Sequence, residues 1–269
     1  MSDNYFAVFG NPIEHSKSPI IHKEFAKQEN SNINYKKILV TSKDDLEKKI
    51  KCFTEKNGFG ANITIPFKVD AFHLFKEKTN RAKIAMSVNT IFKSEGVWCC
   101  DNTDGEGLVL DLIRLNINIS KSKILIIGAG GAARGIINPI LERNPKQLFI
   151  TNRSIDKALF LSDIFDIHPI EFNKLNLYSY DIIINCTSSS LFNIELDIDN
   201  NIFQNALLAY DLFYSNNETK FLLQAKKHGA KNLSDGLGML VFQGALSYQL
   251  WKNFAPDVNP VIKKLRQLI

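Results

Sequence analysis

The feature that most constrains this chain is the segment Gly128-Ala-Gly-Gly-Ala-Ala-Arg134, which directly follows the apolar run Ile124-Leu-Ile-Ile127. A run of branched aliphatic residues ended by glycine is typical of a buried parallel strand that leads into a tight turn. Gly128 permits the turn, Gly130 lets backbone amides approach a phosphate, and Ala133 permits close helix packing. The following helix would point its unpaired amides and positive dipole end at the same place. The segment therefore predicts a turn that binds the pyrophosphate of a dinucleotide.

The end of the next apolar run indicates which dinucleotide is bound. An NAD site has an acidic residue about 20 residues after the glycine turn, whereas NADP needs cationic or hydrogen-bonding groups for its 2'-phosphate. Residues 148–151 lead into Asn152-Arg153-Ser154 without a carboxylate, and Lys157 follows one helical turn later. The planar donor fork of Arg153 suits a phosphate. These residues favour NADP, with a solvated turn arginine as the alternative.

The composition of the chain limits which class of protein it can be and which partners it can have. A chain of 269 residues with 45% hydrophobic residues can bury two cores of moderate size. It has no apolar run of the roughly 20 residues needed to cross a membrane, and its first five residues do not resemble a secretory signal. We therefore expect a cytoplasmic protein without a membrane partner. The net charge of +5 favours small anionic ligands, and no basic stripe with interleaved aromatic residues indicates nucleic acid.

The cysteines and histidines do not have the spacing of a metal site. Cys52, Cys99, Cys100 and Cys186 form no CxxC pair, and the five histidines are scattered. We expect no metal and no disulfide, with buried, reduced cysteines and with histidines that are surface or structural residues.

Apolar periodicity in the first hundred residues alternates between strand and helix. Expected strands at 5–9, 34–40 and 60–65 are separated by helices at 19–26 and 43–56, which implies parallel pairing. Ser18 is the expected N-cap of the first helix. Residues 88–92 and 97–100 flank a turn at 93–96 and predict a hairpin, so this sheet should be mixed. A helix at 104–116, with Asp104 as its cap, would bridge to a second lobe.

The second half predicts a doubly wound lobe. Strands expected at 124–127, 147–151, 181–185, 207–210 and 231–233 alternate with helices. Leu240, Leu246, Leu250 and Phe254 form the apolar stripe of an amphipathic helix, and 260–268 form a last one. The predicted fold is α/β: a substrate domain with a mixed, mainly parallel sheet at 1–103, completed by the C-terminal helices at 239–269, and a Rossmann-type NADP-binding domain at 104–238.

Several polar clusters lie at turns and strand ends, where function concentrates on α/β scaffolds. Alone, each has an ordinary structural explanation, such as helix capping or a solvated lysine. Asn89 and Gln243 are exceptions, because an amide on an apolar face needs a hydrogen-bond partner. The clusters are His15-Ser-Lys-Ser-Pro19, Asn62-Ile-Thr-Ile-Pro-Phe-Lys68, Val88-Asn-Thr90, Asp101-Asn-Thr-Asp-Gly105 and Gln243.

Taken together and in order, these motifs resemble the shikimate dehydrogenase family. The resemblance runs the length of the chain through His15–Pro19, Gly60–Lys68, Val88–Thr90, Asn102–Gly105, the Gly128 turn, Asn152–Ser154 and Gly236-Leu-Gly-Met-Leu240. It implies an NADPH-dependent enzyme that reversibly reduces the C3 carbonyl of 3-dehydroshikimate to shikimate, the fourth step of chorismate biosynthesis. Two lobes are expected to close over the substrate.

The resemblance also implies residue roles. Lys68 and Asp104 would be the catalytic pair. The substrate would be held by Ser16, Ser18, Thr64, Lys68, Asn89, Asp104, Tyr214 and Gln243. NADP(H) would be bound by Gly128, Ala129, Gly130, Gly131, Ala132, Asn152, Arg153, Ser154, Lys157, Thr187, Leu212 and Gly236, and Gly236 would line the cleft with Tyr214.

Some residues of this chain differ from the family pattern, and two other functions are compatible with the same motifs. Residues 85–88, the serines at 188–190 and Leu212 differ from the usual family residues, which bears on loop shape and nicotinamide contacts. One alternative is a quinate/shikimate dehydrogenase that uses NAD. Another is a non-catalytic NADP-binding sensor of the same fold. A monomer and a homodimer are both compatible with the sequence.

Overall fold

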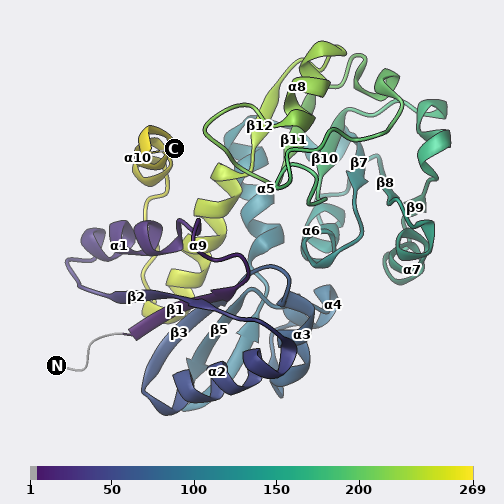
Figure 1. Cartoon of the computed structure of the whole chain (residues 1–269). Coiled ribbons are helices and arrows are strands. Elements are labelled where there is room, and N and C mark those ends of the chain that lie inside the picture. The colour runs from purple at the N-terminus through teal and green to yellow at the C-terminus, as the bar shows by residue number, and fades with distance from the viewer. Residues whose placement is uncertain (1–4, 269) are drawn as a thin grey trace. The chain divides into compact units, whose positions relative to one another are not determined.

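The computed structural model describes residues 5–268, which divide into two compact units. The first contains the residues up to Gly107 together with Leu240–Leu268, and the second is Leu108–Met239. The chain passes from one unit to the other within α5 (Asp104–Arg114) and again within α9 (Leu237–Lys252). Figure 1 shows these elements in chain order. Within residues 5–268, no helix combines the length and apolar character needed to cross a membrane.

The first unit is built on a mixed six-stranded sheet with the order β2-β1-β3-β5-β6-β4. β1 pairs in parallel with both β2 and β3, whereas β5 pairs antiparallel with β3 and β6. The strands are β1 Tyr5–Gly10, β2 Asn34–Leu39, β3 Gly58–Ile63, β4 Glu77–Lys78, β5 Thr90–Ser94 and β6 Val97–Asp101. The helices are α1 Ser18–Gln28, α2 Lys43–Glu55, α3 Lys68–Leu74, α4 Asn80–Ala85, the end of α9, and α10 Asn259–Leu268.

Strand alternation sends side chains of β1 to both faces of this sheet. Ala7 and Phe9 join an apolar cluster with Phe53 of α2. Phe6 points the other way, and its ring lies 5.0 Å from that of Trp251 in α9. In Figure 1, α2 lies on one face of the strands, and α1 and α9 lie on the other. The C-terminal helices therefore complete the core of the first unit, as the sequence predicted.

The second unit is a doubly wound sheet whose paired strands are all parallel. Its order, β9-β8-β7-β10-β11-β12, is that of a Rossmann fold, with the reversal of direction between β7 and β10. The strands are β7 Lys123–Ile127, β8 Gln147–Thr151, β9 His168–Pro169, β10 Ile182–Asn185, β11 Leu208–Asp211 and β12 Leu233–Asp235. The helices are α6 Gly131–Leu141, α7 Ile155–Phe165 and α8 Lys220–Lys227, with 3-10 turns η1 Ile119–Lys121, η2 Phe172–Leu177 and η3 Asn200–Phe203.

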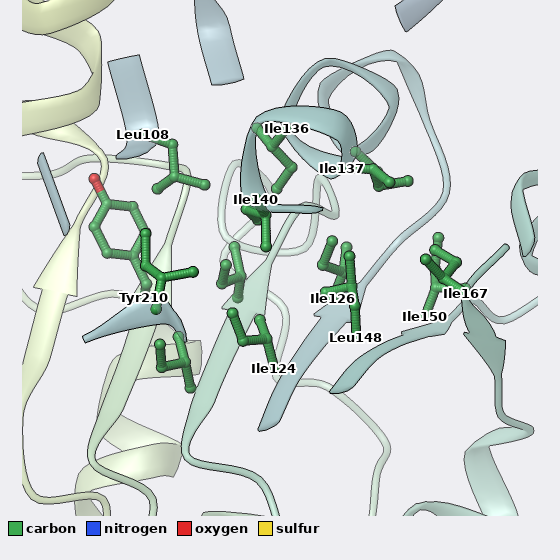
Figure 2. Close-up of a cluster of buried hydrophobic side chains, with 14 of the residues drawn as sticks. Leu108, Ile124, Ile126, Ile136, Ile137, Ile140, Leu148, Ile150, Ile167 and Tyr210 are labelled. Carbon is green, nitrogen blue, oxygen red and sulfur yellow. The ribbon is translucent and has the colours of Figure 1, made fainter. Parts of the chain in front are cut away.

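Both faces of this sheet are buried, which explains the continuous apolar runs of its strands. Ile124 and Ile126 pack against Ile136 and Ile140 of α6, as Figure 2 shows. The alternate residue Leu125 joins a cluster with Phe221 of α8 on the opposite face.

The structure corrects several local predictions. Lys17, not Ser18, is the N-cap of α1, and it makes no side-chain cap hydrogen bond. The hairpin turn is only Glu95-Gly96, because positive φ angles at both residues close a two-residue turn. The last strand, β12, begins at Leu233 and not at residue 231. The short strands β4 and β9, of two residues each, had no periodicity to reveal them.

Candidate active site

A lysine–aspartate ion pair lies in the first unit. Lys68 is the first residue of α3 and Asp104 the first residue of α5. Lys68 Nζ donates to Asp104 Oδ2 at 2.7 Å, and the side chains are only 15% and 5% exposed. The predicted cap role of Asp104 needs correction, because Asp104 is already helical and its carboxylate accepts from Lys68 and Asn89. A partly buried ammonium held in this way can donate a proton and stabilise negative charge on a nearby oxygen.

Two buried amides complete the surroundings of this pair. Asn89 Nδ2 donates to Asp104 Oδ1 at 2.9 Å and to Gln243 Oε1 at 3.1 Å. Gln243 Nε2 donates to the carbonyl oxygen of Leu240 at 2.7 Å. The structure thus brings four of the predicted site residues together, from segments as distant as α3 and α9. Asn89 lies just before β5 and not within a strand, as the sequence had suggested.

A layer of hydroxyl and amide groups lies behind the pair, and the sequence analysis largely missed it. Asn62 donates to Ser247 Oγ at 3.1 Å, and Thr90 and Ser247 lie 2.7 Å apart. Thr103 donates its backbone N–H to Asn89 Oδ1 at 2.9 Å. Asn62, Thr90, Thr103 and Ser247 are all at most 5% exposed. The available signals were the polar clusters that contain Asn62, Thr90 and Thr103, together with Ser247, which stands one helical turn after Gln243 on the same face.

The layer ends at two buried aromatic side chains. Tyr35 Oη donates to Asn62 Oδ1 at 2.7 Å, and His22 Nε2 lies 3.2 Å from the same oxygen. The two rings stack with centroids 4.8 Å apart. Burial lowers the pKa of His22 to about 3, so its ring is neutral near pH 7. Burial also raises the pKa of the Tyr35 phenol well above its usual value. His22 is therefore a structural residue, as predicted.

The predicted carboxylate-binding hydroxyls lie near the carboxyl ends of β1 and β3. Ser16 Oγ donates to Ser18 Oγ at 3.2 Å, and both lie where the chain enters α1. Thr64 follows the last residue of β3, and its methyl group occupies the space beside Gly10 at the end of β1. Because β1 and β3 are parallel neighbours, these segments meet at one edge of the sheet.

The glycine turn of the second unit has the geometry that the sequence predicted. Gly128 has φ +110° and follows β7, and a Cβ there would lie 3.1 Å from the backbone of Cys186. Gly130 is the N-cap of α6, and a Cβ there would meet no atom within 4 Å. The glycine at 128 is thus required by the fold, whereas the space beside Gly130 is large enough for a ligand group. A pyrophosphate fits this turn, which lies at the switch point of the sheet beside the N-terminus of α6.

The predicted adenosine-end residues follow β8. Asn152 Oδ1 accepts from the backbone N–H of Ala129 at 3.2 Å, so this amide braces the glycine turn. Its Nδ2 donates to the carbonyl oxygen of Ser154 at 2.9 Å. Arg153 and Lys157 are both exposed, in the turn after β8 and the first turn of α7. No carboxylate stands at residues 152–154, which suits a 2'-phosphate.

The loops after β10 and β11 carry the remaining predicted contacts. Thr187 donates its hydroxyl to Asn185 Oδ1 at 2.7 Å, and Leu212 donates its backbone N–H to the Asn185 carbonyl at 3.0 Å. A Cβ on Gly236 would lie 2.1 Å from the Leu212 carbonyl oxygen, so a glycine is required there for packing. Tyr214 is half-buried, and its ring lies 6.1 Å from that of Phe213. These four residues lie in the second unit.

The four cysteines are free, but only Cys100 is buried as predicted. Cys52 is exposed, and Cys99 and Cys186 are half-buried. Among residues 5–268, no group of three or more histidine, cysteine or acidic side chains could hold a metal ion.

Comparison with known proteins agrees with this arrangement. Family models match residues 8–91 (shikimate dehydrogenase substrate binding domain), 111–211 (shikimate / quinate 5-dehydrogenase) and 236–266 (shikimate 5'-dehydrogenase C-terminal domain). The shikimate dehydrogenase (NADP(+)) of Colwellia psychrerythraea is 44% identical over 264 residues, covering 97% of this chain and 96% of that protein.

Solved structures give the same answer. An Ael1 enzyme from Pseudomonas putida is 37% identical with a TM-score of 0.92, covering 98% of each chain. Shikimate 5-dehydrogenase from Thermus thermophilus, in complex with NADP(H) and shikimate, is 28% identical with a TM-score of 0.89, covering 98% of this chain and 99% of that chain. This chain therefore belongs to the shikimate dehydrogenase family.

Proposed function

We infer that this protein is an NADP-dependent shikimate dehydrogenase, which reversibly reduces 3-dehydroshikimate to shikimate in the biosynthesis of chorismate and aromatic amino acids. The observation that carries this proposal is the Lys68–Asp104 pair, at 2.7 Å and bordered by Asn89 and Gln243, in a chain of this family. We also propose that the enzyme acts in the cytoplasm, which agrees with a biosynthetic role of this kind.

Lys68 is the proposed proton donor in the direction of reduction. The nicotinamide of NADP(H) supplies the hydride chemistry, and the protein stabilises the negative charge that develops on the carbonyl oxygen. The Lys68 ammonium stabilises that oxygen and gives it a proton, because a cation in a partly dehydrated site acts more strongly than in water. Asp104 orients the ammonium through its Oδ2, while Asn89 holds Oδ1.

The first unit is the proposed substrate domain. Ser16 and Ser18, whose hydroxyls lie 3.2 Å apart, would receive the carboxylate. Thr64, Asn89, Asp104 and Gln243 would bind the ring hydroxyl groups. Small anionic substrates also agree with the chain's net charge of +5.

The second unit is the proposed NADP domain. Gly128 to Ala132 would hold the pyrophosphate at the N-terminus of α6. The adenosine end would be bound by Asn152, Arg153, Ser154 and Lys157, with Arg153 on the 2'-phosphate. Thr187, Leu212 and Gly236 would adjoin the nicotinamide.

A parallel assay at 340 nm tests this proposal, with shikimate and quinate each offered to the purified protein with NADP+ or NAD+. We expect turnover with shikimate and NADP+. Preference for quinate or NAD+ would instead support a quinate/shikimate dehydrogenase. Cofactor binding without turnover of either substrate would support a sensor and refute the enzymatic role.

A further inference from the structure

The buried polar layer behind Asp104 is held together by hydrogen bonds, and the orientation of the Asn89 amide is fixed at one end of it. Asn89 Oδ1 lies 2.9 Å from the backbone nitrogen of Thr103, and Nδ2 lies 2.9 Å from Asp104 Oδ1. The reverse orientation of the amide would place its NH2 against an N–H and its oxygen against a carboxylate. Asn89 Oδ1 is therefore an acceptor that faces into the layer.

Thr90 and Ser247 extend the layer with their hydroxyls. Thr90 Oγ1 lies 2.8 Å from Asn89 Oδ1, to which it donates, and 2.7 Å from Ser247 Oγ. Ser247 Oγ donates to the carbonyl oxygen of Gln243 at 2.9 Å and accepts from Asn62 Nδ2 at 3.1 Å. The two hydroxyls therefore join Asn62, Asn89 and the backbone of Gln243.

Asn62 fixes the other end. Its Nδ2 also lies 3.2 Å from the carbonyl oxygen of Asn89, which only accepts, so its Oδ1 faces Tyr35 and His22. The neutral His22 ring therefore carries its proton on Nε2. The layer thus joins Tyr35 and His22 to Asp104 through Asn62, Ser247, Thr90 and Asn89.

We propose that Thr90 and Ser247 are positioning residues for the reaction of Lys68 and Asp104, an inference that rests on the proposed function. Both side chains are 0% exposed, so they act through their neighbours and not by touching substrate. Their hydroxyls hold the Asn89 amide in the orientation that binds Asp104 and Gln243. Thr90 does so directly, through Asn89 Oδ1, and Ser247 does so through its contacts with Thr90 and the Gln243 backbone.

Thr90→Val and Thr90→Ser form a matched pair that tests this role. Valine keeps the shape and removes the hydroxyl, whereas serine keeps the hydroxyl. We expect Thr90→Val to lower kcat/KM for shikimate about tenfold, the scale of one net hydrogen bond lost from the reacting complex. The KM for NADP+ should stay within about twofold, and Thr90→Ser should restore most of the activity. Ser162→Ala is the control, because it removes a buried hydroxyl that donates to the Leu159 carbonyl of its own helix in the second unit.

Ser247→Ala gives an independent route, since alanine suits the interior of α9. Ser247→Ala should also lower kcat/KM for shikimate. The double variant with Thr90→Val should lose less than the product of the two single losses, because both hydroxyls belong to one hydrogen-bonded layer. Wild-type kinetics in both single variants, or independent multiplicative losses, would overturn the proposal. So would equal losses in Thr90→Val and Thr90→Ser. A wild-type protein without shikimate turnover would instead overturn the proposed function.

Discussion

Gly130→Ala should separate folding from cofactor binding, because the structure has room for the methyl group and the proposed pyrophosphate does not. Gly130 has φ −89°, a conformation open to alanine, and no atom lies within 4 Å of the added Cβ. Replacing this glycine with alanine stabilises the folded protein by about 0.4–1 kcal/mol, because it reduces the conformational entropy of the unfolded chain. It is a poorer N-cap than glycine by a similar amount. The free energy of unfolding should therefore change by no more than about 0.5 kcal/mol.

NADPH binding by Gly130→Ala should weaken markedly. A methyl group forced into a close contact costs roughly 1–3 kcal/mol, which corresponds to a Kd increase of about 5- to 150-fold. Urea unfolding and NADPH titration by fluorescence would measure the two quantities on the same preparation. Gly128→Ala is the matched control: its φ of +110° and the Cys186 backbone 3.1 Å away should cost about 1–3 kcal/mol of stability. An unchanged Kd in a stable Gly130→Ala variant would refute the pyrophosphate assignment.

Four further changes test the other assignments. Lys68→Ala should reduce kcat by a factor on the order of 100 or more. Lys49→Ala, which removes a pair with Asp45 and a hydrogen bond to the Leu39 carbonyl, both outside the site, should leave kcat unchanged; steady-state kinetics would measure both. Arg153→Ala should weaken NADPH far more than NADH in parallel titrations, and equal losses would contradict the 2'-phosphate role. Thr151→Val should raise the free energy of unfolding by about 1 kcal/mol in urea melts, because Thr151 Oγ1 is buried without a partner among the described residues. His22 takes up a proton near pH 6.5 when unfolded and near pH 3 when folded. Wild type should therefore lose about 1.6 kcal/mol more of its free energy of unfolding than His22→Gln between pH 6.5 and 5. Parallel losses in urea melts would contradict the burial of His22 as a neutral ring.

Most of the longer strands and helices of both units were predictable because their periodicity is local. The apolar run before Gly128 and the alternation of strand and helix were enough to predict a doubly wound sheet. The exact start of α1 was not predictable, because Lys17 and Ser18 are both acceptable at the start of a helix and sequence patterns locate a helix end only to within one or two residues. Asn89 and Gln243 were recognised as amides that need partners, but their mutual contact joins residues 154 positions apart. No local pattern specifies such a contact.

The burial of α9 shows most clearly why the remainder of the site could not be derived from the sequence. The apolar stripe predicted to face the core, Leu240, Leu246, Leu250 and Phe254, is only half-buried. The fully buried side carries Gln243 and Ser247 beside Tyr248 and Trp251. A polar residue on a buried helix face is favourable only when its partners are already in place, and Asn62 lies 185 residues earlier in the chain. Hydrophobic periodicity therefore located the helix, and Gln243 and Ser247 are buried on the inward side as expected, but it did not give the centre of that side, because hydrogen bonds to β3 and β5 also determine the orientation of the helix.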